Sequence, residues 1–240
     1  MVKIDLNEAL DALDAARGLD REDLIANSLL KAGVAYLERG QLDPAAEALE
    51  EARHYCVKLD NQLGVAQVDL RLAAIAQGRG DLAAAAGRLK DVLEVFAAAG
   101  DTTGQVTALE RLAQLLALAG RWEEAAGCLE RALELVAGAG DQVAEVVLNQ
   151  NLAPMLRRAG KSAQSLAAYE RMGLAAQELG DHQRLALALV GVGTLQAEAG
   201  SLAPALKNLA QAEAVYRELG QMTRANQVRE EIQRLEAREA

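Results

Sequence analysis

The sequence predicts an all-α fold, an α-solenoid of helical hairpins, on two observations of spacing. Glycine recurs every 40 residues at one set of positions: Gly40, Gly80, Gly120, Gly160 and Gly200. A second set lies halfway between, with aspartate in its two earliest places: Asp20, Asp60, Gly100, Gly140, Gly180 and Gly220. A helix-breaking residue about every 20 residues is typical of stacked hairpins, with one hairpin in each period.

The segment around Gly120 shows how one hairpin is encoded. Apolar side chains lie at helical spacing between Val106 and Ala119. Gly120 can take the positive φ that ends a helix. Glu123 opens the next helix, where a carboxylate suits the positive end of the helix dipole. Aspartate follows three of the halfway glycines and is expected to cap the next helix: Asp101, Asp141 and Asp181.

Two offsets from the turn glycines hold only small residues. Seven residues before the glycine the chain has Gly33, Ala73, Ala113, Ala153 and Gly193. Five residues after it the chain has Ala45, Ala85, Ala125, Ser165 and Ala205. Small residues let two helices approach closely, so we expect the helices of each hairpin to cross here. Large residues nine after the glycine are expected to fill the seam between hairpins: Leu49, Leu89, Leu129, Tyr169 and Leu209.

The unbroken period predicts one domain over residues 1–240. It begins with an N-terminal half-repeat helix, 1–20, and ends with a C-terminal capping helix, 221–240. The five repeats between them are 21–60, 61–100, 101–140, 141–180 and 181–220. Only three prolines occur and no Ser/Gly-rich stretch interrupts the period, so we expect no linker.

Composition excludes several classes of protein. The net charge is −10 and aromatic residues make up 2% of the chain, which argues against a nucleic-acid partner. Cys56 and Cys128 are expected to be buried, reduced thiols. The residues after Met1 do not form a secretory signal, and no apolar run is long enough to span a bilayer. We therefore expect a cytoplasmic protein that has no membrane contact.

No constellation of catalytic or metal-binding residues is visible. His54 and His182 stand alone, without a further ligand at the right spacing. The segment 191–193 has a Gly-Val-Gly sequence but no strand before it, so it is not a phosphate loop. We expect no enzyme, no cofactor and no metal.

The chain resembles the tetratricopeptide repeat in residues 32–52 and again in residues 112–132. The second stretch carries the pattern Leu112-Ala113, Leu116, Gly120-Arg121-Trp122-Glu123-Glu124-Ala125, Leu129 and Ala132. The 40-residue length is similar to the long repeats of kinesin light chains, LGN and MalT. This resemblance implies a right-handed α-solenoid of about five hairpins, whose first helices line a concave groove that binds peptide segments. Asp69 departs from the pattern, because an apolar residue is usual there.

The groove candidates come from the offset that faces the groove in those families, nine residues before the glycine. That offset holds Lys31, Arg71, Arg111, Asn151 and Gly191. Further candidates on the same face are Gln114, Gln150, Leu187 and Val190. These residues favour a protein or peptide partner with an acidic part and an apolar anchor. The basic side chains could equally be paired with acids of neighbouring helices, such as Glu110 or Asp69.

Three functions are therefore considered. The first is a non-catalytic scaffold that holds a partner segment in the groove. The second is a regulatory sensor that responds to a ligand or peptide. The third is a self-assembling scaffold, in which the N-terminal half repeat stacks on a neighbouring copy and gives a homo-oligomer.

Overall fold

The computed structural model describes residues 5–138 and 140–237. The first four residues of the predicted N-terminal helix segment, residue 139 and the last three residues of the predicted capping segment lie outside the described residues. Within the described residues every regular element is a helix, and there are twelve of them. The predicted all-α fold of repeated hairpins is confirmed.

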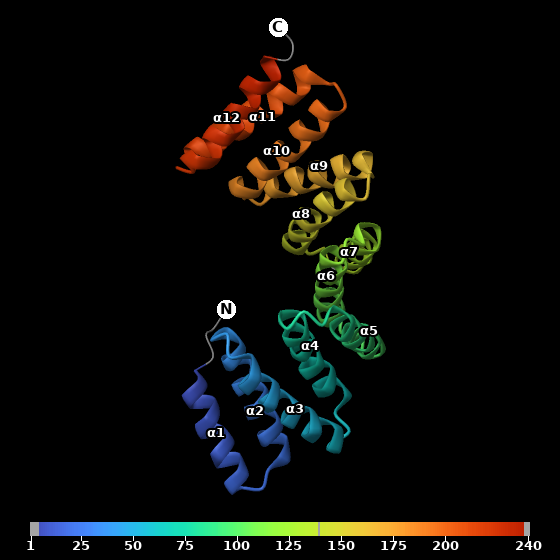
Figure 1. The fold of residues 1–240 in the computed structure, drawn as a ribbon, viewed down its shortest axis with the longest axis vertical. Coiled ribbons are helices and arrows are strands. Elements are labelled where there is room, and N and C mark those ends of the chain that lie inside the picture. The colour runs from blue at the N-terminus through green and yellow to red at the C-terminus, as the bar shows by residue number, and fades with distance from the viewer. Residues whose placement is uncertain (1–4, 139, 238–240) are drawn as a thin grey trace. The chain divides into compact units, whose positions relative to one another are not determined.

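The helices fall into two compact units, the first running to Leu115 and the second beginning at Leu116 (Figure 1). The first unit holds α1 (Leu6–Gly18), α2 (Glu22–Glu38), α3 (Leu42–Lys58), α4 (Gln62–Gly78), α5 (Leu82–Ala98) and most of α6 (Thr102–Leu118). The second unit holds α7 (Trp122–Ala137), α8 (Gln142–Arg158), α9 (Ser162–Glu178), α10 (His182–Glu198), α11 (Leu202–Glu218) and α12 (Met222–Glu236). We describe each unit by itself, and the single domain over residues 1–240 stays a prediction.

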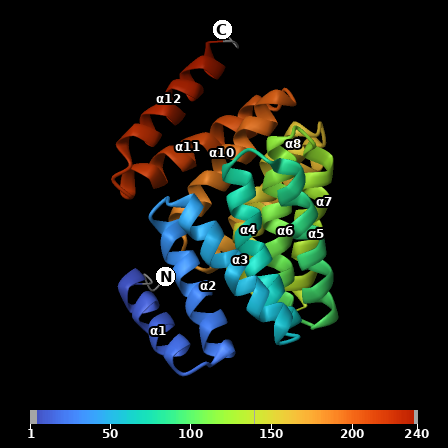
Figure 2. The same cartoon turned by 60° about the horizontal axis from the view of Figure 1, so that its bottom comes forward.

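Within each unit, consecutive helices pack on one another. In the first unit this holds from α1 to α5, as the neighbouring blue and teal helices of Figure 2 show. In the second unit it holds from α7 to α12. The core is a seam of small and branched side chains, in which Leu49, Val68 and Leu72 join α3 to α4. Burial of such a seam stabilises the stack by roughly 25 cal/mol for each Å² of apolar surface removed from water.

The turns use the predicted residues. All nine periodic glycines have positive φ, from 66° at Gly140 to 82° at Gly80, and Asp20 and Asp60 adopt the same left-handed conformation at φ 53°. This conformation lets the next amide reach back, as Gln41 N does to Tyr36 O at 3.0 Å. The predicted caps are confirmed, since the carboxylates of three aspartates accept from amides three residues on: Asp101, Asp141 and Asp181.

The small residues lie where the helices of a hairpin cross, as predicted. Ser165 Oγ donates to Ala153 O at 2.7 Å and joins the two small offsets directly. A Cβ atom added to Gly33 would lie 2.6 Å from Leu49 Cγ. Leu49 therefore fills space inside its own hairpin as well as the seam to the next. Tyr169 differs, because its ring lies against Gly191 of the following hairpin.

Candidate partner-binding sites

A cavity of about 520 Å³ opens in the first unit between α2, α4 and the start of α6. Lys31 of α2 and Arg71 of α4 line it together, as the offset from the turn glycines predicts. Leu30, Leu70 and Phe96 supply apolar walls. The cavity thus combines cations with an apolar surface on the side formed by first helices.

The floor of this cavity depends on Gly104. A Cβ atom there would lie 2.7 Å from the Phe96 ring, so only glycine allows the ring to pack beneath α6. Asp101 Oδ1 accepts from Gly104 N at 2.8 Å and fixes the first turn of α6. The carboxylate of Asp101 is therefore already engaged, although it also lines the cavity.

The electrostatics of the first unit centre on Arg111 of α6. Its Nε is buried and has no hydrogen-bond partner among the described residues. Desolvation lowers the pKa of the Arg111 guanidinium, the nearby charge of Arg71 lowers it further, and Glu110 acts in the opposite direction. The charges of Arg71 and Arg111 thus disfavour one another, Glu110 offsets part of this cost, and a further anion would offset more of it.

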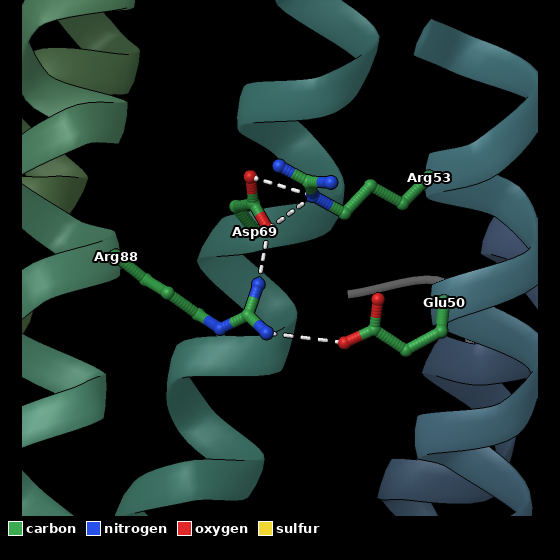
Figure 3. A network of polar contacts seen from close by, with 4 residues as sticks. All are labelled: Glu50, Arg53, Asp69 and Arg88. Atoms are coloured by element: carbon green, nitrogen blue, oxygen red, sulfur yellow. Dashed lines mark hydrogen bonds and ion pairs between the residues drawn. The ribbon is translucent and has the colours of Figure 1, made fainter. Parts of the chain in front are cut away.

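Asp69, one of the two acids considered as partners of this basic cluster, is engaged elsewhere. Asp69 is buried, with 8% of its surface exposed. It binds Arg53 Nε at 2.9 Å and Arg88 Nη1 at 2.6 Å (Figure 3). Asp69 therefore does not pair with the basic offset, whereas Glu110, the other acid considered, acts on Arg111. The partners of Asp69 come from α3 and α5, because it occupies a side of α4 that faces the second helices.

The other predicted residues are distributed over both units. Gln114 is exposed on α6 in the first unit, and Asn151 is half-buried on α8 in the second. Gln150 and Leu187 line one cavity of about 310 Å³ in the second unit. Leu187 and Val190 line another of about 320 Å³. The structure thus brings together Lys31 with Arg71, and Gln150 with Leu187 and Val190.

Two arginines of the second unit were not predicted from the sequence. Arg184 Nε donates to Gln150 Oε1 at 3.0 Å, and Arg184 also pairs with Asp181 at 2.5 Å. Arg224 lies with its guanidinium 5.7 Å from the centre of the Tyr216 ring. Each arginine lies four residues after a halfway glycine, at the offset where Gly64 and Gly104 are small. That departure from a small residue was the signal available in the sequence.

Other sequence expectations have these outcomes. Cys56 and Cys128 are both buried thiols, as predicted. Within the described ranges, no group of three or more His, Cys, Asp or Glu residues is placed to hold a metal ion. None of the described helices is both long and apolar enough to cross a membrane.

Comparison with known proteins agrees with this architecture. Residues 64–137 match the family model of the tetratricopeptide repeat. BtubC (BKLC) from P. vanneervenii has a similar structure, with a TM-score of 0.76, 17% identity, and coverage of 90% of this chain and 91% of that chain. No curated protein matches the sequence.

Two further solved structures are similar. A signal-transduction ATPase with numerous domains from Pyrococcus horikoshii, which has a tetratricopeptide-repeat sensor, gives a TM-score of 0.70 at 16% identity, over 86% of this chain and 32% of that chain. A Rap protein complexed with competence and sporulation factor gives 0.64 at 16% identity, over 97% of this chain and 70% of that chain. At such low identity these likenesses concern the fold alone.

Proposed function

We propose that this chain, a tetratricopeptide-repeat protein, is a non-catalytic scaffold that binds a segment of a partner protein along its first helices. Solenoids of this kind generally present extended surfaces to other proteins. The observation that carries the proposal is the cavity in which Lys31 and Arg71 lie beside apolar walls, with the charge of Arg71 also acting on the desolvated Arg111. Natural proteins tolerate such local cost mainly at functional sites.

The chemistry of the first unit favours an acidic segment with an apolar anchor. A carboxylate between Arg71 and Arg111 would accept charge-assisted hydrogen bonds and remove the repulsion between them. Lys31 adds a further cation, on the same cavity as Arg71. Leu70 and Phe96 would cover an apolar side chain of the same segment.

The second unit offers contacts of a different kind. Leu187 and Val190 line an apolar cavity together with Tyr216 and Val228. Gln150 and Asn151 lie on α8 and would contact the backbone of an extended segment. We expect this unit to hold the less charged part of a partner.

The test compares two triple variants. The first changes Lys31, Arg71 and Arg111 to Glu. The control changes three exposed cations to Glu, and so has the same change in charge: Arg39, Lys90 and Arg131. The partner is captured from the native cell, and its affinity for each variant is measured by calorimetry. Loss of at least tenfold in the first variant alone is expected, and an unchanged affinity in that variant would show the groove assignment to be wrong.

A peptide-responsive sensor is the second candidate. It is favoured by the likeness to the Rap protein complexed with competence and sporulation factor and to the archaeal sensor array. A sensor must differ in conformation between its free and bound states. A change in radius of gyration when the captured ligand is added, measured by small-angle scattering, would favour the sensor. An unchanged radius would favour the plain scaffold.

Self-assembly is the third candidate, because α1 is a half repeat that packs on α2. A helix of this type could stack on another copy of the chain. Light scattering over a wide concentration range tests it, and a monomer at high concentration contradicts it.

A further inference from the structure

A further cavity, of about 340 Å³, lies in the second unit between α7, α8 and α9. Leu133 of α7 and Leu174 of α9 form its apolar walls. Glu145 and Glu178 contribute carboxylates and Arg171 one cation, so that its lining has one net negative charge. Because α7 and α9 are second helices, this groove is built differently from the first-helix cavities.

Asn149 forms the floor of this groove, with only 4% of its surface exposed. Its Nδ2 donates to Glu145 O at 2.9 Å, which fixes the orientation of the amide. Its Oδ1 is buried and has no hydrogen-bond partner among the described residues. A buried acceptor without a partner costs about 1–3 kcal/mol of folding free energy. A hydrogen-bond donor from a bound ligand would offset this cost at Asn149 Oδ1.

In the first unit, the residue equivalent to Asn149 has hydrogen-bond donors from neighbouring helices. Asn149 stands two 40-residue periods after Asp69, which occupies the equivalent position on α4. The guanidinium groups of Arg53 and Arg88 both donate to the Asp69 carboxylate (Figure 3). Two periods later, Arg53 is replaced by Leu133 and Arg88 by Ala168. The groove that two arginines fill above Asp69 is thus open above Asn149.

We propose that the groove over Asn149 binds the guanidinium group of an arginine side chain from a partner protein. A planar guanidinium has five donors, enough to reach Asn149 Oδ1 and a carboxylate of Glu145 or Glu178 together. Leu133 and Leu174 would cover the apolar stem of the arginine. This site is independent of the proposed first-helix function and would let the chain hold a second partner, or a second part of the same one.

The direct test uses N-acetyl-arginine amide as the probe and N-acetyl-citrulline amide, its neutral counterpart, as the control. Binding is followed by nuclear magnetic resonance on the backbone amides of the residues that line the groove, which every variant retains, and in the wild type also on the side-chain amide of Asn149. We expect saturable shifts with arginine and none with citrulline. Asn149→Asp, which restores the carboxylate found at position 69, should tighten binding about tenfold, the effect of roughly 1.4 kcal/mol.

Two variants should abolish binding by different routes. Asn149→Leu removes the acceptor, and the chain already has leucine at this place in other first helices: Leu29, Leu109 and Leu189. Leu133→Arg places an arginine of the chain itself in the groove, at the position equivalent to Arg53 in the first unit. This variant still tests binding if Asn149→Leu does not fold. Equal shifts with citrulline, unaltered binding in either variant, or no saturable shift in the wild type would each overturn the proposal. The triple Glu variant of the first unit should bind the probe like the wild type, which separates the two proposals.

Discussion

Arg53 Nε of α3 lies 2.9 Å from Asp69 Oδ1 of α4, and this pair recurs with its charges exchanged four periods later. There Glu213 of α11 takes the place of the arginine, and Arg229 of α12 lies 2.7 Å from it. Between these pairs the same two offsets hold Leu93 and other uncharged residues. A stack shifted by one repeat would place a charged side chain opposite leucine, so the pairs disfavour incorrect register.

Removing Asp69 should destabilise the first unit. Asp69→Ala leaves Arg53 and Arg88 without their shared acceptor, but both arginines are partly exposed and can regain water. We expect a loss of about 1–3 kcal/mol in the free energy of unfolding, measured with urea and circular dichroism. In a double-mutant cycle with Arg53→Ala the two changes should be non-additive by at least about 0.5 kcal/mol. Additive losses would show that the pair contributes no coupling.

The period alone was sufficient to predict the hairpins, their turns and their crossing points. Each of these depends on a local requirement, such as the positive φ of Gly180 or the space above Gly33. The position of Asp69 was recognised as unusual, but its partners were not. They come from two other helices and become evident only when α3 and α5 are placed on either side of α4.

The same limit applies to the sites. Lys31 and Arg71 were found because a fixed offset places them on one face. Arg224 was missed because its position depends on the Tyr216 ring beneath it. The unpaired oxygen of Asn149 could not be predicted, because it depends on the replacement of Arg53 and Arg88 by Leu133 and Ala168 on two neighbouring helices rather than on any property of asparagine.

The Tyr169 ring packs against Gly191, and substitutions at both positions test this contact. A Cβ atom at Gly191 would lie 2.6 Å from the Tyr169 ring, so Gly191→Ala should cost about 1–3 kcal/mol by overpacking. Tyr169→Leu gives this hairpin the leucine found at the same offset in the other repeats, such as Leu209. In that background Gly191→Ala should no longer destabilise and should gain up to about 1 kcal/mol from helix propensity. Thermal unfolding of the four proteins measures this, and an equal loss in both backgrounds would contradict it.

Asp181 should make the stability of the second unit depend on pH. Its Oδ1 accepts from Arg184 N at 3.0 Å, and this hydrogen bond is the main reason why the pKa of Asp181 is lowered, with the Arg184 side chain adding to it. A carboxyl whose folded pKa is lowered stabilises the fold above its unfolded pKa, and this contribution is lost as the pH falls through the folded pKa.

Asp181→Asn tests this contribution with the cap retained, since Asn61 caps α4 by accepting from Gly64 N at 2.9 Å. At neutral pH the variant should be less stable by roughly 0.5–1 kcal/mol, because the charge at the helix N-terminus and the pair with Arg184 are lost. The difference from the wild type should vanish in acid, below the ordinary aspartate range. Urea unfolding at a series of pH values measures it, and a difference that is constant with pH would contradict the assignment.

Replacing Arg111 should stabilise the fold but weaken the binding of a partner. Arg111→Met keeps an unbranched side chain of similar length while it removes a desolvated charge beside Arg71. Replacing a poorly compensated buried charge by an apolar group is often stabilising, and for this half-buried residue we expect a gain of about 1 kcal/mol. The same variant should bind an acidic partner segment about tenfold more weakly, because one charge-assisted contact is lost. Urea unfolding and calorimetry measure the two effects. A variant that loses stability instead would show that Arg111 is held in place by the fold itself and is not kept for a partner.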